Sequence, residues 1–86
     1  MRGVIRVGDV TDRGCEVQTG CETSTVGGRA VARVGDRCRC ASGLGICEII
    51  EGDRNATIEG RNIAFDHHRT SCGGYLISSA KTSGIA

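Results

Sequence analysis

The residues of this chain that could act together in chemistry are its six cysteines, among 86 residues in all. Four of them, Cys15, Cys40, Cys47 and Cys72, stand at related places in a repeated sequence. A tetrahedral zinc site needs four such thiolate ligands, each about 2.3 Å from the metal. Their spacing is not the paired CxxC of a zinc ribbon, so they predict a metal site only where the fold brings them to one point.

A three-fold repeat supplies a reason for such convergence. The unit is best formed in residues 28–36, Gly-Arg-Ala-Val-Ala-Arg-Val-Gly-Asp, and residues 5–9, Ile-Arg-Val-Gly-Asp, are a shorter copy. The third copy, residues 63–68, has His67 and His68 in place of Gly-Asp. We expect this loss to matter little to the fold but to break the three-fold match on one side of the molecule.

Alignment of the sequence with itself at an offset of 32 residues supports the repeat. Residues 17–40 placed on 49–72 agree at seven positions, where average composition gives about one or two. The identical pairs are Gly20/Gly52, Thr25/Thr57, Gly28/Gly60, Arg29/Arg61, Ala32/Ala64, Arg37/Arg69 and Cys40/Cys72.

The three copies of the repeat are expected to bring the chain three times to one narrow end of the molecule. The positions that enter it, four residues after each unit, are Arg13, Cys40 and Cys72. The positions that leave it, two residues before the next apolar residue, are Cys15, Cys47 and Gly74. The apolar residues that follow are Val17, Ile49 and Leu76. Cysteines therefore fill four of the six positions, which predicts a shared metal site, with small buried cysteines or a disulfide pair as the alternative.

The remaining thiols have a different pattern. Cys38 occupies the slot that Thr11 and Thr70 hold in the other copies, and Cys21 occupies the slot of Asp53. Neither slot requires a thiol in every copy. We therefore expect both to be free cysteines, with Cys38 a weaker alternative for the metal.

The two histidines are also weaker alternatives as ligands. His67 and His68 lie beside the expected cysteine site, so that either could replace one cysteine. The competing hypothesis is a pair of solvent-exposed turn histidines.

Composition indicates one small domain, residues 1–86, with a thin core. The chain has 14 glycines and only two aromatic residues, Phe65 and Tyr75. A domain of this size buries only about 60–65% of its unfolded surface. Such chains need a disulfide, a metal or a partner to reach useful stability. The net charge of +1, without a basic stripe, argues against a nucleic-acid partner.

The cysteines are expected to meet a reducing environment. Residues 1–6 have neither the apolar core nor the cleavage site of a signal peptide, and no apolar run approaches a membrane span. We therefore predict synthesis in the cytoplasm, where cysteine clusters hold metal more often than disulfides. A secreted disulfide scaffold is the alternative.

Short β-branched segments separated by glycine predict an all-β fold of hairpins. The expected strands are residues 2–9, 16–26, 29–34, 48–58, 61–65 and 75–80. Two-residue turns are expected at Gly27-Gly28 and Glu59-Gly60, and a long loop at 41–47. No window shows a helical period of any length.

The order of three motifs resembles the PAAR-repeat family, the spike-tip proteins of type VI secretion systems and contractile phage tails. The motifs are Ile-Arg-Val-Gly-Asp-x-Thr near the start, Gly-Arg-Ala-Val-Ala-Arg-Val-Gly-Asp in the middle and Thr-Ser-Cys-Gly-Gly-x-Leu-Ile-Ser-Ser near the end. The resemblance covers residues 4–80. It implies a small conical domain of β-hairpins with pseudo-three-fold symmetry and a zinc site at the apex.

The resemblance also implies a partner and a place of action. The wide base of the cone would cap a trimeric β-helical spike, of the VgrG type or a phage central spike, one chain per trimer. The protein would belong to the virion tail and baseplate or be secreted with the injection spike, and would touch the target membrane only on piercing. We expect no effector extension beyond the last strand.

The metal ligands differ from those of the family. Its Thr-x-His-Gly-Gly motif corresponds here to residues 11–15, Thr-Asp-Arg-Gly-Cys, and its Cys-Pro-x-His-Gly motif to Cys-Ala-Ser-Gly at 40–43. Two family histidines are therefore absent, and Cys15 and Cys47 lie nearby. The expected ion is zinc, with iron as the alternative.

Catalysis is not expected. The possible pairs, Cys72 with His67 or His68 and Asp9 with Asp12, lack an identifiable third group that would orient them, and a cone offers no cleft. The sequence thus predicts a structural tip that helps to pierce the target envelope. A free-standing zinc- or iron-binding β module that recognises another protein is the alternative.

Overall fold

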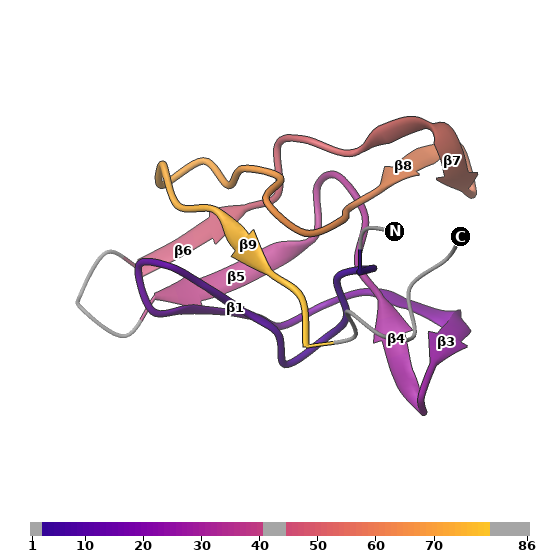
Figure 1. Cartoon of the computed structure of the whole chain (residues 1–86), viewed down its shortest axis with the longest axis horizontal. Helices are drawn as coiled ribbons and strands as arrows, with labels where there is room; N and C mark the ends of the chain where they lie inside the picture. The colour runs from indigo at the N-terminus through magenta and orange to yellow at the C-terminus, as the bar shows by residue number, and fades with distance from the viewer. Residues whose placement is uncertain (1–2, 41–44, 80–86) are drawn as a thin grey trace.

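The fold consists of short antiparallel strands. A computed structural model describes residues 3–40 and 45–79, and this part of the chain contains nine strands and no helix. The strands are β1 (Val10–Thr11), β2 (Cys15–Val17), β3 (Cys21–Val26), β4 (Arg29–Val31), β5 (Arg37–Cys40), β6 (Gly45–Glu48), β7 (Asp53–Ile58), β8 (Arg61–Ile63) and β9 (Leu76–Ile77). One sheet has the order β6-β5-β2-β1-β9, and β3–β4 and β7–β8 are separate hairpins (Figure 1). The predicted all-β class is confirmed.

Three chain segments close a ring around a pseudo-three-fold axis. The amide of Ile5 donates to the carbonyl of Ala64 at 3.0 Å, and the amide of Ala64 donates to Ala32 at 3.0 Å. The amide of Ala32 donates back to Ile5 at 2.8 Å. All three residues are fully buried. The three copies of the repeat are therefore three equivalent segments of one ring.

Each copy then makes the same turn. Gly8, Gly35 and His67 have φ angles of 94°, 92° and 72°. Their amides donate to the carbonyls of Val17, Ile49 and Leu76 at 2.9, 2.8 and 2.7 Å. Position 67 thus adopts the left-handed conformation without a glycine. The expectation that the third copy breaks the match is wrong at this turn.

A side chain completes each turn by accepting a backbone hydrogen bond. The Oδ2 atom of Asp9 accepts from Arg6 N at 2.9 Å, and that of Asp36 accepts from Arg33 N at 2.7 Å. In the third copy the acceptor is His68 Nδ1, 2.9 Å from Phe65 N. Aspartate and histidine both present an acceptor at the required place.

The two hairpins are copies of each other. Gly27 and Gly28 have φ angles of 62° and 80°, and Glu59 and Gly60 have 54° and 79°. Two positive φ angles in succession fit a type I′ turn, which suits a two-residue hairpin. Both predicted turns are confirmed. The register also shifts at the same place in both, between Cys21 and Thr25 and between Asp53 and Thr57.

The expected strand 16–26 is broken into β2 and β3. The break is at Gly20, where an added Cβ would lie 2.8 Å from the carbonyl oxygen of Val31. The expected strand 48–58 breaks in the same way at Gly52, whose Cβ would lie 2.8 Å from that of Asn62. Close contact with the neighbouring strand therefore forces glycine and a bend at both places.

The other expected strands are shorter in the structure. Of the expected strand 2–9, residue 2 lies outside the described part, and the rest contributes isolated bridges at Val4 and Arg6 and then a turn. The segments 29–34, 61–65 and 75–80 contain β4, β8 and β9 and isolated bridges at Arg33, Phe65 and Tyr75, and residue 80 lies outside the described part. Of the expected loop 41–47, residues 41–44 also lie outside it, and residues 45–47 belong to β6, which pairs with β5.

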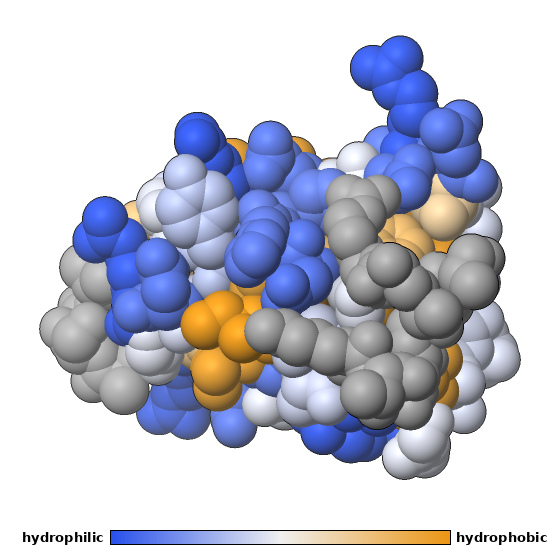
Figure 2. Space-filling view, in the orientation of Figure 1, coloured by the Kyte–Doolittle hydropathy of each residue, from blue (hydrophilic) through white to orange (hydrophobic). Residues whose placement is uncertain are grey.

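The two ends of the molecule differ in character. In Figure 1 the β1–β2 turn, the facing ends of β5 and β6 and the turn before β9 lie at one end, and the two hairpins lie at the broader opposite end. We call the end opposite the hairpins the narrow end. The larger core cluster contains the buried cysteines Cys15, Cys40 and Cys47 of that end. A second cluster, Val4, Val31, Ile63 and Phe65, packs against the partly buried hairpin residues Val26, Ala56 and Ile58. The face seen in Figure 2 is largely hydrophilic, with small apolar patches.

Candidate metal centre

The four predicted cysteines meet at the narrow end. The sulfur atoms of Cys15, Cys40, Cys47 and Cys72 all lie within 4.8 Å of one another. Cys15, Cys40 and Cys47 come from β2, β5 and β6, and Cys72 comes from the turn before β9. The first three are buried and Cys72 is partly exposed.

Strand register explains this convergence. Cys15 lies directly opposite Cys40 in the β2–β5 ladder, and Cys38 lies opposite Cys47 in the β5–β6 ladder. Side chains alternate between the two faces of a strand, so Cys38 and Cys40 share the buried face while Arg37 and Arg39 face outward. The sequence Arg-Cys-Arg-Cys therefore places two thiols inside.

Three of the sulfur separations are close to those around a single ion. Cys15 and Cys72 are 3.6 Å apart, Cys40 and Cys47 are 3.6 Å apart, and Cys40 and Cys72 are 4.0 Å apart, measured between Sγ atoms. Four thiolates arranged tetrahedrally at about 2.3 Å from zinc would be about 3.8 Å from one another. The donor set thus suits one thiophilic ion, zinc or iron, held by four cysteines.

The same four sulfurs also allow a disulfide. The structure joins Cys15 to Cys40, whose Cα atoms are 3.9 Å apart, and leaves Cys47 and Cys72 as thiols. This pair is the disulfide alternative that the sequence left open. A four-thiolate site requires this bond to be reduced.

Hydroxyl groups beside the cysteines were given no role by the sequence. The Oγ1 atom of Thr11 accepts from Cys15 N at 3.1 Å, and that of Thr70 lies 3.0 Å from Cys72 Sγ. Both threonines are buried. In the repeat alignment, Thr11 and Thr70 occupy the same position as Cys38, which is fully buried beside Cys47. This shared position was the signal in the sequence that the two threonines lie close to the cysteines.

The thiols differ in acidity. Burial, and then the nearby Cys47, raises the pKa of Cys38 to about 12. Burial also raises the pKa of Cys47, with a further contribution from Cys72. Burial acts in the same direction on Cys72, but hydrogen bonds from Thr70 and the backbone of Gly74 outweigh it and lower the pKa of that thiol. Cys72 is therefore the first of these three to form a thiolate.

The weaker alternatives lie outside the group of four. Within residues 3–40 and 45–79, Cys38, His67 and His68 do not belong to the set of donors that surround one point. His68 uses Nδ1 in its turn, and the His67 side chain is largely exposed beside Asp66.

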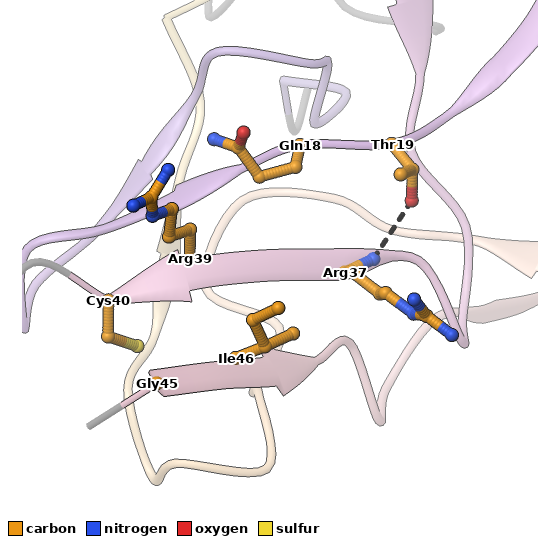
Figure 3. Close-up of a pocket in the computed structure, with 7 residues that line it drawn as sticks. All are labelled: Gln18, Thr19, Arg37, Arg39, Cys40, Gly45 and Ile46. Atoms are coloured by element: carbon orange, nitrogen blue, oxygen red, sulfur yellow. Dashed lines mark hydrogen bonds between the residues drawn. The ribbon is translucent and has the colours of Figure 1, made fainter. Parts of the chain in front are cut away.

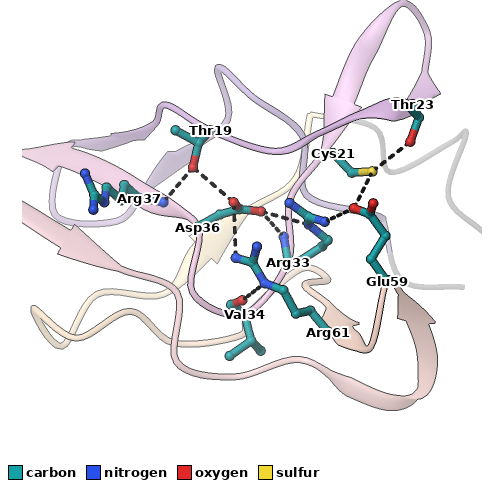
Figure 4. Close-up of polar contacts among 9 residues, drawn as sticks. All are labelled: Thr19, Cys21, Thr23, Arg33, Val34, Asp36, Arg37, Glu59 and Arg61. Atoms are coloured by element: carbon teal, nitrogen blue, oxygen red, sulfur yellow. Dashed lines mark hydrogen bonds and ion pairs between the residues drawn. The ribbon is translucent and has the colours of Figure 1, made fainter.

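Cys21 lies in a separate polar network (Figure 4). Its sulfur is 3.2 Å from Thr23 Oγ1 and 3.6 Å from Glu59 Oε1. The Thr23 hydroxyl lowers the pKa of this thiol. Glu59 in turn pairs with Arg33 at 2.7 Å. The expected assignment of Cys21 as a free cysteine apart from the cluster agrees with this position.

Figure 4 also shows Asp36 as the centre of that network. Its buried carboxylate accepts from Thr19 Oγ1 at 3.0 Å and pairs with Arg61 at 3.3 Å. In the first copy Asp9 pairs with Arg29 at 3.0 Å. These equivalent ion pairs fix the hairpins to the ring.

An open groove of about 720 Å³ borders the cluster (Figure 3). It is lined by Gln18, Thr19, Arg37, Arg39, Cys40, Gly45 and Ile46. The expectation that the molecule has no cleft is therefore too strict. The lining contains neither a carboxylate nor a histidine that could act as a base beside a nucleophile.

In the described part of the chain, no helix is long and apolar enough to cross a membrane.

Comparison with known proteins places the chain in a family. A comparison with the curated proteins finds no match. The family model of the PAAR motif matches residues 7–78, nearly the whole chain. That family is structural rather than enzymatic, and its members are associated with spike tips. With its three-fold ring and its cysteine cluster at one end, this chain belongs to the PAAR-motif family.

Proposed function

We propose that the protein is the pointed cap of a trimeric β-helical spike in a contractile injection machine, a phage tail or a type VI secretion system. One chain would sit on one trimer, of the VgrG type or a phage central spike, and help to pierce the target envelope. The observation that supports this most is the ring of Ile5, Ala32 and Ala64. A single chain with three equivalent segments can match the three-fold axis of a trimer.

The hairpin end is the proposed docking face. Val26, Ala56 and Ile58 remain partly exposed there over the second core cluster. Strand edges and apolar side chains at such an end are stabilised by pairing with another protein. Without the spike, the free protein should therefore tend to associate.

The cysteine end is the proposed apex. One zinc ion bound by Cys15, Cys40, Cys47 and Cys72 would hold β2, β5, β6 and the turn before β9 together, and iron is the alternative ion. Metal binding would add stability that a thin core cannot supply. Four thiolates around zinc carry a net charge of −2. The Arg13 guanidinium lies beside Gly73, next to Cys72, where it could offset part of that charge.

The protein would be made in the cytoplasm and leave it with the tail or the spike. Native mass spectrometry with the spike protein encoded beside it tests the partner. The expected species contains three spike chains and one cap. Three caps per trimer, or no complex, would contradict the proposal, and no complex would favour a free-standing metal module.

Two matched variants locate the docking face. Ile58→Asp places a charge at the hairpin end and should abolish the complex. Ile46→Asp places the same charge on β6, where the side chain is 68% exposed, and should leave the complex intact. Equal loss in both variants would argue against docking through the hairpins.

A further inference from the structure

We propose that the four-cysteine cluster is a redox-gated metal site, in which a hydroperoxide oxidant joins Cys15 to Cys40 and thereby releases the ion. The inference rests on the metal binding proposed above and adds how that binding is regulated. The two states use the same sulfurs and exclude each other, because a disulfide sulfur no longer offers a thiolate.

The pairing of β2 with β5 selects the disulfide. Cys15 and Cys40 stand directly opposite each other in that ladder, with Cα atoms 3.9 Å apart. In the metal state their sulfurs would be about 3.8 Å apart, and a disulfide brings them to about 2.05 Å. Two side chains can make this change of roughly 2 Å while the backbone stays paired.

The other two sulfurs are placed as ligands rather than as bonded partners. Cys72 lies 3.6 Å from Cys15 and 4.0 Å from Cys40, and Cys47 lies 3.6 Å from Cys40. Once Cys15 and Cys40 are joined, only these two thiolates remain for the ion. A structural zinc site needs four ligands, so the ion is lost.

The chemistry balances with hydrogen peroxide as oxidant. One thiolate attacks a peroxide oxygen, breaks the O–O bond and becomes a sulfenic acid, with release of hydroxide. The second thiolate attacks that sulfur, forms the S–S bond and expels a second hydroxide. The two sulfurs lose two electrons in total and the peroxide gains them. Four protons complete the reaction, two converting the hydroxides to water and two restoring the Cys47 and Cys72 thiols.

The selected pair is buried, so the oxidant must be small. Cys40 is among the residues that line the open groove beside Ile46, with its side chain on the buried face of β5 (Figure 3). Cys38 also faces a cysteine, Cys47, across a ladder, but it does not belong to the group of four sulfurs that surround one point. We therefore assign the bond to Cys15 and Cys40, with Cys38 left as a thiol.

The metal-bound state and the disulfide state link different elements at the narrow end. A bound ion ties β2, β5, β6 and the turn before β9 to one point, whereas the disulfide ties only β2 to β5. Oxidation should therefore loosen β6 and that turn while β2 stays paired with β5.

The test starts from reduced protein loaded with one zinc ion per chain. Hydrogen peroxide should release the ion, as followed with a chromogenic chelator, in step with the loss of two thiols. Tryptic mapping should then find peptide 14–29 joined to peptide 40–54, with fragmentation locating the bond at Cys15 rather than Cys21 and at Cys40 rather than Cys47. Dithiothreitol and added zinc should restore the original state.

Cys38→Thr and Cys21→Ser are matched controls, since both should bind zinc and release it as the wild type does. Zinc that stays bound under peroxide, or zinc release with disulfides to Cys38, Cys47 or Cys72, would contradict the proposed redox regulation but not the metal site. Reduced wild-type protein that binds no zinc overturns the metal site, and the gate with it.

Discussion

At the scale of single residues, the third copy of the turn shows which atoms the fold requires. His67 takes the place of Gly8 and Gly35 at a φ of 72°. A non-glycine residue in this conformation costs roughly 1–2 kcal/mol. At Gly35 an added Cβ would also meet the Arg61 guanidinium at 2.9 Å. The same backbone position therefore holds a side chain in one copy, whereas in another a side chain would have to displace the Arg61 guanidinium that pairs with Asp36.

We expect Gly35→Val to destabilise the protein by about 2–4 kcal/mol, and His67→Val by about 1 kcal/mol, because valine adds branching at a position that already holds a side chain. His67→Gly should be neutral or stabilising. Thermal unfolding measures this, at roughly 4–8 °C per kcal/mol for a domain of this size. Equal shifts for the two valine variants would show that the Arg61 contact does not matter.

His68 replaces an aspartate as the acceptor of its turn. His68→Ala removes the Nδ1 atom that accepts from Phe65 N at 2.9 Å, and should cost about 1 kcal/mol. His68→Asp supplies a carboxylate like that of Asp9 and should stay within about 0.5 kcal/mol of the wild type. Chemical denaturation of both variants checks this. A loss in His68→Asp as large as in His68→Ala would mean that the imidazole has another role.

At the scale of elements, the metal centre depends on how three strands and one turn are brought together. β2 and β5 present opposed cysteines, β6 adds Cys47 across from Cys38, and the turn before β9 adds Cys72. Each of these four elements holds one sulfur of the cluster. Each ligand therefore also acts as a tie between elements.

Replacing Cys40 or Cys72 by serine should lower the metal content of reduced protein well below one ion per chain and cost several kcal/mol, because metal binding is coupled to folding. Cys21→Ser and Cys38→Thr should keep the full content, since Thr11 and Thr70 already fill the slot of Cys38. Elemental analysis and unfolding in reducing buffer decide this. Full metal in Cys15→Ser with loss in His67→Ala or His68→Ala would place a histidine in the site.

At the scale of the whole molecule, the repeat made the three-fold plan predictable from sequence, because identical residues recur where identical hydrogen bonds are needed. The convergence of Cys15, Cys40, Cys47 and Cys72 followed from the same alignment. The strands β5 and β6 were not predicted, since each has four residues and their pairing depends on contacts outside the segment. The bond between Cys15 and Cys40 also depends on register, which spacing alone does not determine.

The closed ring of Ile5, Ala32 and Ala64 has a consequence for how the chain opens over time. Residues near a chain end usually fray, and their amides exchange with solvent through local opening. The amide of Ile5, however, belongs to the same ring as those of Ala32 and Ala64. Deuterium exchange at these three amides should therefore be the slowest in the protein, at one shared rate set by global unfolding. A faster rate at Ile5 would show that the first segment can leave while the other two stay joined.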